Sequence, residues 1–179
     1  MSAFRWPTNY LVVTQRWAGT DPAEPGRYHA ADAEGWARAS RSTFAGAHYS
    51  KPYHNGLDMR AYAGTNLYSV APGTVESHPD YTSPNTGTVN HRIRIRISPH
   101  CRVTYAHLTA GTAIPIGTKV VAGTVVGKSG MSGTLEAHLH FEVEVLYGTR
   151  WFECNPENFM PAHKLKDGTP VAAGTRSIP

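Results

Sequence analysis

One short run of residues constrains the fold of this chain more than any other feature. Residues 92–97 read Arg-Ile-Arg-Ile-Arg-Ile, so every second side chain is apolar. Successive side chains of a β-strand point to opposite faces of a sheet, so the isoleucines of this run would share one face and the arginines the other. The run therefore predicts a strand in a sheet with one apolar face.

Turn signals divide the rest of the chain into further strands. The dipeptide Gly-Thr recurs along the sequence; glycine permits the positive φ of a tight turn, and β-branched threonine suits the strand that follows. The predicted strands cover residues 10–17, 67–70, 73–78, 88–98, 102–108, 119–129, 138–146 and 150–154. We predict a mostly β fold, an antiparallel sheet or two packed β-sheets that form a groove, with few short helices. Helix is expected at 30–42 and, as a single turn, at 155–159.

Length and composition indicate one globular domain. The chain has 179 residues, of which 40% are apolar and 17% charged, and this balance suits a single folded core. We predict one domain over residues 1–179, with its core at about 10–160 and a polar, loosely held C-terminal tail at 162–179. We expect a monomer.

Charge and hydropathy limit the partners that this chain can have. The formal net charge is +4 without a dense basic run, so we predict no nucleic-acid partner, although this charge would favour an anionic surface such as a cell wall. No apolar run approaches the ~20 residues that span a bilayer, so we predict no membrane span. The N-terminal apolar stretch, Tyr10–Val13, is shorter than the ~7–15 residues of a secretory signal. We expect the chain to leave its producer by another route, or to be a shortened form of a secreted protein.

The two cysteines do not form a metal site of their own. Cys101 and Cys154 are far apart in the sequence and are not a CxxC pair. Two thiolates alone cannot build a structural zinc site. Two buried thiols and one long-range disulfide both remain open.

The first group with chemical potential is His54-Asn-Gly-Leu-Asp58. A histidine and an aspartate four residues apart can converge on one point if the backbone bends at Gly56. Imidazole nitrogen and carboxylate oxygen are both good zinc donors, at ~2.0–2.2 Å. The pattern taken alone occurs often by chance, so its weight depends on the rest of the chain.

The second group is His138-Leu-His140, inside a predicted strand. Residues i and i+2 of a strand share a face, so two imidazoles would emerge side by side while Leu139 and Phe141 turn to the core. The third is Tyr105-Ala-His107-Leu at the end of another predicted strand. The alternative for the second group is a strand edge with two exposed histidines, and the alternative for the third is a histidine that caps a strand.

Together the three groups suit a hydrolytic zinc site. Catalytic zinc commonly takes three protein ligands and keeps an open position for water, whose pKa it lowers to ~7. The reaction also needs a base for the water's proton and a donor for the oxyanion. The chain has no HExxH motif to supply a helical glutamate, so spare histidines would serve instead.

The order of the three groups is similar to that in the lysostaphin/LytM-like peptidoglycan endopeptidases. The sequence between them also resembles this family, in Ala63-Gly-Thr65, in Ala71-Pro-Gly-Thr-Val75 and over residues 116–127. Residues 13–17 look like the opening strand of phage-encoded members. The resemblance covers about residues 10–160.

The resemblance implies a role for each residue. By position, His54, Asp58 and His140 would bind one Zn²⁺ per chain, and His107 and His138 would flank the water as catalytic residues. Which of these two histidines is the base stays open. Members of the family also use an upstream tyrosine as oxyanion donor, for which the candidates are Tyr49 and Tyr53.

The implied function is a zinc metalloendopeptidase that degrades bacterial peptidoglycan at the cell wall, by cutting a stem peptide or a cross-bridge. Without a secretory signal, we expect a phage endolysin or a virion-associated lysin, and hence an antimicrobial activity. The alternative is a non-catalytic module of a phage tail or cell envelope, zinc-bearing and structural or wall-binding. This chain departs from many relatives in having Glu136-Ala137 before the HLH group and its own loop at 79–87. These departures concern the shape of the groove and its bond preference.

Overall fold

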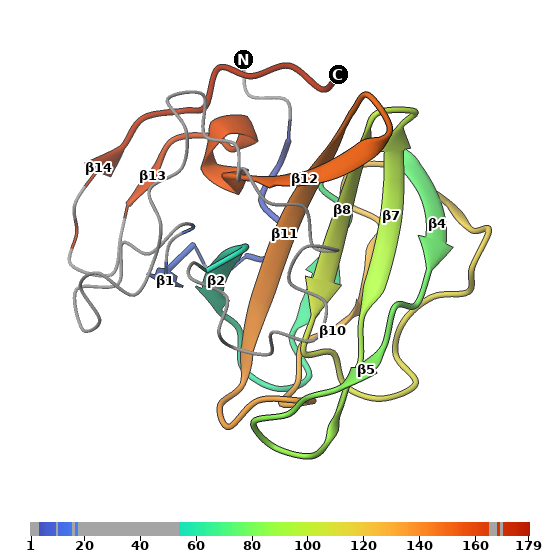
Figure 1. Ribbon diagram of the computed structural model, residues 1–179. Coiled ribbons are helices and arrows are strands. Elements are labelled where there is room, and N and C mark those ends of the chain that lie inside the picture. Colours follow the sequence, from blue (N-terminus) through green and yellow to red (C-terminus); the bar gives the residue numbers. More distant parts are fainter. Residues whose placement is uncertain (1–3, 10, 16, 18–53, 165–167, 169) are drawn as a thin grey trace.

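A large antiparallel sheet organises this protein (Figure 1). The computed structural model describes residues 4–9, 11–15, 17, 54–164, 168 and 170–179. The strands of this sheet, in spatial order, are β1 (Val13–Gln15), β2 (Leu57–Arg60), β11 (His138–Tyr147), β8 (Cys101–Ala106), β7 (Ile93–Ser98), β4 (Gly73–Ser77) and β9 (Lys119–Val120), while β12 (Arg150–Cys154) also pairs with β11. The predicted mostly β, antiparallel fold is confirmed.

Three small two-stranded sheets and one helical turn complete the described part of the chain. The pairs are β3 (Asn66–Tyr68) with β10 (Val125–Lys128), β5 (Tyr81–Thr82) with β6 (Val89–Asn90), and β13 (His163–Lys164) with β14 (Pro170–Val171). The predicted turn after β12 is the 3-10 helix η3 (Pro156–Phe159). Asn155 caps this turn by accepting a hydrogen bond from the Glu157 N–H, which explains where the turn begins.

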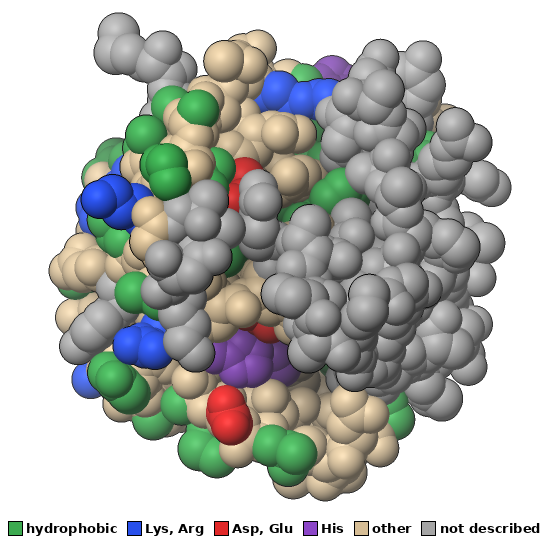
Figure 2. Space-filling model, turned by 90° about the vertical axis from the view of Figure 1, so that its left-hand side faces the viewer, with side chains coloured by type: hydrophobic (Ala, Val, Ile, Leu, Met, Phe, Trp, Pro, Cys, Tyr) green, Lys and Arg blue, Asp and Glu red, His purple; other side chains and the backbone are tan. Residues whose placement is uncertain are grey.

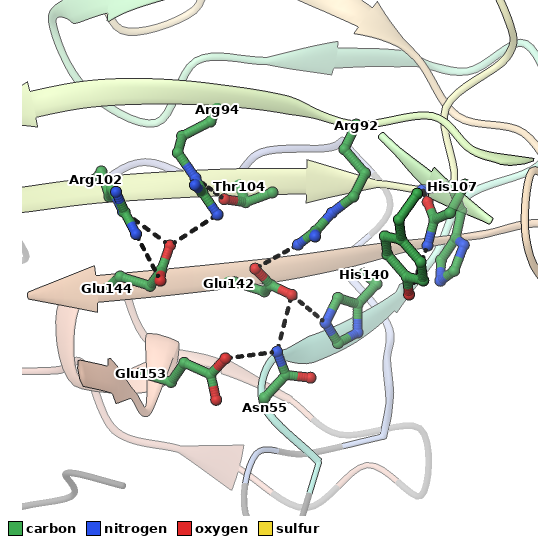
Figure 3. A network of polar contacts seen from close by, with 12 residues as sticks. Asn55, Arg92, Arg94, Arg102, Thr104, His107, His140, Glu142, Glu144 and Glu153 are labelled. Carbon is green, nitrogen blue, oxygen red and sulfur yellow. Dashed lines mark hydrogen bonds and ion pairs between the residues drawn. The ribbon is translucent and has the colours of Figure 1, made fainter. Parts of the chain in front are cut away.

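The apolar face of the main sheet forms the core. Ile93 and Ile95 of the alternating run are fully buried, as are Leu139, Phe141 and Val143 on β11. The alternate residues of both strands lie on the opposite face, as the alternation predicts. On that face Arg94 of β7 and Arg102 of β8 form ion pairs with Glu144 of β11, and Arg92, which directly precedes β7, pairs with Glu142; Figure 3 shows these contacts from close by.

Two predicted strands are each divided into two. Residues 88–98 form β6 and β7 with a break at residues 91 and 92. There the main-chain N–H groups bond to side chains and not to a neighbouring strand. The Arg92 N–H donates to the Asp80 carboxylate at 2.7 Å, and the His91 N–H donates to the Ser132 hydroxyl at 2.9 Å. Residues 119–129 form β9 and β10, because Gly123 takes a φ of +94° in the turn between them. The short strands β2, β5, β13 and β14 were not predicted.

The described part of the C-terminal segment forms hydrogen bonds with the helical turn η3 and its neighbours. His163 is buried, and its Nε2 lies 3.0 Å from the Glu157 carboxylate. Further along, the Gly174 N–H donates to the Met160 carbonyl at 2.8 Å and the Arg176 N–H to the Asn158 carbonyl at 3.0 Å. These hydrogen bonds join residues 174 and 176 to η3 and the residue after it.

Two expectations concern helices. The helix predicted at 30–42 lies outside the described residues. Within the residues that the structure does describe, no helix has the length and apolarity needed to cross a membrane.

Candidate metal centre

The strands β2 and β11 bring two of the predicted ligands together. They pair antiparallel with Asp58 directly opposite His140, and two positions further along the ladder Arg60 lies opposite His138. Leu57 and Met59 on β2 are fully buried in the core, so Asp58 must point to the other face, where His140 also lies. The register of one strand pair thus sets the relative position of a carboxylate and an imidazole that are 82 residues apart.

His54 completes a tight group of three donors. It precedes β2, and its Nε2 lies 3.1 Å from His140 Nδ1 and 3.2 Å from Asp58 Oδ1. His140 Nδ1 in turn lies 2.8 Å from Asp58 Oδ1. One potential ligand atom from each residue falls within 4.8 Å of the others. The side chains of both histidines are 11% exposed and that of Asp58 13%, so the group is recessed but reachable.

Gly56 permits this approach by its lack of a side chain. A Cβ built at this position would lie 2.7 Å from both Cε1 and Nε2 of His140 and 2.7 Å from the Phe141 carbonyl oxygen. Its φ is not among the positive values of the described glycines, so a left-handed backbone is not the reason for glycine here. The glycine of the His54–Asp58 motif is therefore required by the packing of the His140 ring.

The electrostatics of the group suit a cation. Burial opposes ionisation of Asp58, but the charge of His54 and hydrogen bonds from both histidines outweigh it and hold the pKa of this carboxyl well below its usual value. Burial would likewise lower the pKa of His140, yet hydrogen bonds to Asp58 and Glu142 raise it to about 9. The ionised carboxylate supplies negative charge, and two imidazoles with one carboxylate form a donor set that fits Zn²⁺.

The two remaining histidines of the motifs lie beside this group. The His107 and His138 rings are 4.6 Å apart between centroids, and the His107 ring is 6.0 Å from that of His140. His138 Nε2 lies 3.8 Å from Asp58 Oδ2. On the face of the molecule drawn in Figure 2, histidine side chains gather at one place and reach the surface. The structure therefore brings all five predicted residues together.

Hydrogen bonds to the main chain fix the tautomers of these two rings. His107 Nδ1 lies 2.7 Å from the Ser132 carbonyl oxygen, and His138 Nδ1 lies 2.9 Å from that of Glu136. A carbonyl oxygen can only accept, so Nδ1 carries the proton in both rings and Nε2 is left to accept another. Burial, together with the charges of His140 and His138, lowers the pKa of His107 to about 3, so this ring is neutral.

His107 has a backbone conformation that is rare for a residue with a side chain. Its φ is +62°, in the left-handed region. Two hydrogen bonds hold it: its N–H donates to the Asn90 side-chain oxygen at 3.0 Å, and its carbonyl accepts from the Gly130 N–H at 2.7 Å. This conformation turns the ring at the end of β8 toward His138, and such strain is common at functional sites.

Some residues near the site could not be found from the motifs. Asn55 and Glu142 form hydrogen bonds around His140, and Arg92 pairs with Glu142. Glu142 could have been suspected, because it is two residues after His140 on the same face of the strand. Tyr49 and Tyr53, the candidate oxyanion donors, lie outside the described residues.

Comparison with known proteins places this arrangement in a family. The model of peptidase family M23 matches residues 52–153, more than half of the chain and all five of these residues. The comparison with curated proteins found no match.

Solved structures share the fold. The catalytic domain of a mutant of the prophage-encoded M23 protein EnpA from Enterococcus faecalis is 22% identical with a TM-score of 0.55, over 81% of this chain and 88% of that one. A zinc-containing peptidase from Vibrio cholerae is 21% identical with a TM-score of 0.58, over 100% of this chain and 41% of that one. Helicobacter pylori Csd3 is 19% identical with a TM-score of 0.58, over 97% and 37%. This chain thus spans about two fifths of the length of the last two.

Proposed function

Because this chain belongs to peptidase family M23, we propose that it is a zinc-dependent endopeptidase that hydrolyses peptide bonds in bacterial peptidoglycan, in a stem peptide or a cross-bridge. The observation that carries the proposal is the convergence of His54, Asp58 and His140 within 4.8 Å, next to two further histidines whose Nε2 atoms can accept protons. In this proposal His54, Asp58 and His140 are the zinc ligands. Bound zinc would act as a Lewis acid and make a water nucleophilic at neutral pH.

His107 and His138 would perform the proton transfers. Both rings hold their proton on Nδ1 by donating to a main-chain carbonyl, so each offers Nε2 as the acceptor for the proton of the attacking water. One of them takes that proton and later passes it to the nitrogen of the departing amine, which completes the hydrolysis. The other, after taking a separate proton from solvent at its Nε2, would donate to the oxygen of the tetrahedral intermediate.

A set of variants tests the assignment of roles. We expect the wild-type chain to bind about one zinc ion, to digest purified peptidoglycan, to lose this activity on chelation and to regain it when zinc is added. His54→Ala should lose both zinc and activity, because it removes one of three ligands.

His138→Ala and His107→Asn should keep zinc and lose about 10²-fold or more in activity, the range for an acid–base or oxyanion group. Asparagine is chosen for position 107 because it tolerates a positive φ.

The control is His100→Ala, at an exposed histidine in the turn between β7 and β8, which should behave as wild type. Metal content by atomic absorption and release of soluble wall fragments by mass spectrometry are the two readouts, and the fragments also identify the bond that is cut. A chain that binds zinc but leaves peptidoglycan from several bacteria intact would support the non-catalytic alternative. Full activity in His54→Ala would refute the ligand assignment.

A further inference from the structure

Glu142 contacts the candidate ligand His140 on the side away from the other ligands. Its Oε1 lies 3.2 Å from His140 Nε2, while His140 Nδ1 lies 2.8 Å from Asp58 Oδ1. A neutral imidazole has one proton and one lone pair on its two nitrogens, and a carboxylate can only accept. Metal binding requires the neutral ring. In that ring Glu142, by accepting from Nε2–H, would leave the lone pair on Nδ1, on the side of Asp58 and His54.

The carboxylate of Glu142 is itself held firmly. Its Oε2 lies 2.7 Å from an Arg92 guanidinium nitrogen, and the two side chains are 3% and 6% exposed. Its Oε1 also accepts from the Asn55 amide at 2.9 Å. An ion pair removed from water is screened little by the solvent, so its hydrogen bonds are strong. Because both carboxylate oxygens of Glu142 make such contacts, they hold the carboxylate in one orientation. Figure 3 shows Glu142 between Arg92, Asn55 and His140.

Asn55 extends these contacts to the other segment that carries ligands. It directly follows His54, and its amide nitrogen contacts Glu142 at 2.9 Å and Glu153 of β12 at 3.1 Å. The chain before β2 is thereby fastened to β11 and β12 at the residue next to His54. Glu142 thus touches His140 directly and touches the neighbour of His54.

We infer that Glu142 is a positioning residue for the metal centre: it keeps His140 in the tautomer that presents Nδ1 and, through Asn55, fixes the segment of His54. This inference rests on the proposed zinc site. Partners of this kind, behind a ligating histidine, are worth about 10–100-fold in metal affinity.

The same strand provides a matched control. Glu144 is two residues further along β11 on the same face, is equally buried, and pairs with Arg94 at 3.2 Å and Arg102 at 3.0 Å. In Figure 3 it lies further along the strand, away from His140. A substitution there disturbs a buried ion pair of the same kind without touching a ligand.

The experiment compares Glu142→Gln and Glu144→Gln in the full chain. The dissociation constant for zinc is measured by competition with a chromophoric chelator, and the urea midpoint of the metal-free form is measured in parallel. We expect both variants to lower the urea midpoint, because each leaves arginine without its carboxylate. Only Glu142→Gln should weaken zinc binding, by about 10–100-fold. In the cobalt(II)-loaded protein, its visible absorption bands should shift, whereas those of Glu144→Gln should match wild type.

Glu142→Asp provides a second variant that keeps the charge beside Arg92 but draws the carboxylate back from His140. It is expected to fold even if Glu142→Gln does not, and to bind zinc at least several-fold more weakly than wild type. Wild-type zinc affinity in either variant, or an equal loss in Glu144→Gln, would overturn the inference and leave the proposed function standing. Failure of the wild-type chain to bind zinc would reject the proposed function, and the inference with it.

Discussion

At the scale of single residues, Gly56 shows how a short motif can encode more than its spacing. The sequence suggested that glycine lets the backbone bend between His54 and Asp58. The structure gives a different reason, since any Cβ at this position would lie 2.7 Å from the ring of His140. Because His140 is distant in sequence, no local pattern could have revealed this contact.

Gly56→Ala should therefore weaken metal binding more than it weakens the fold. The new methyl group must displace His140 or β2, and a shift of a few tenths of an ångström in a ligand is felt directly by the metal. We expect a zinc dissociation constant raised about tenfold or more, measured by chelator competition. The control is Gly64→Ala, where a Cβ meets open space but φ is +85°. It should cost about 1 kcal/mol of unfolding free energy and leave zinc affinity unchanged. Equal zinc affinity in the two variants would contradict this account of Gly56.

At the scale of elements, the alternation of apolar and polar residues predicted the long strands but not the short ones. The arrangement of β7 and β11 follows from apolar residues at every second position, which is why His138 and His140 were correctly placed on one face. The strand β2, which carries Asp58, is only four residues long. Its pairing with β1 on one side and β11 on the other defines it, and a partner distant in sequence cannot be read from a local pattern.

Tyr105 joins β8 to the last residue of β3 and to the chain that follows it, and this link can be tested. Its hydroxyl donates to the Tyr68 carbonyl at 3.0 Å and accepts from the Val70 N–H at 3.0 Å, in a fully buried position. Tyr105→Phe keeps the ring and leaves both main-chain groups without this partner. We expect a loss of about 1–3 kcal/mol in unfolding free energy by urea titration, with zinc affinity retained. A variant as stable as wild type would show that other groups or water replace the hydroxyl.

At the scale of the whole molecule, the order of three motifs was the most informative signal. It predicted membership of the lysostaphin/LytM-like peptidases, and the match to peptidase family M23 confirms that membership. The five site residues were predicted from this order, and the structure brings them together, while their roles and the phage setting stay predictions. The contacts of Arg92 and Asn55 with Glu142 were not foreseen, because ion pairs and amide contacts between segments distant in sequence leave no local spacing.

The two cysteines allow a last prediction about global unfolding. Both are free thiols, fully buried in the described structure. Burial raises the pKa of Cys101 to about 12 and that of Cys154 well above its usual value. Thiols of the unfolded chain ionise near pH ~8.5. Above that pH the unfolded state therefore binds fewer protons than the native state, and the stability that the neutral thiols provide falls as the pH rises toward 12.

We expect the urea midpoint of the wild-type protein to fall between pH 8 and about pH 10.5. In the double variant Cys101→Ala/Cys154→Ala the midpoint should fall less steeply over the same range. Each protein is compared with its own midpoint at pH 8. This internal reference removes the constant cost of the two core truncations. In the native protein at pH 8 both thiols should resist a disulfide reagent that reacts at once in urea, since the thiolate is the reactive form and burial suppresses it. Equal slopes in the two proteins, or rapid labelling of the native state, would show that the thiols are open to solvent and that alkaline unfolding has another origin.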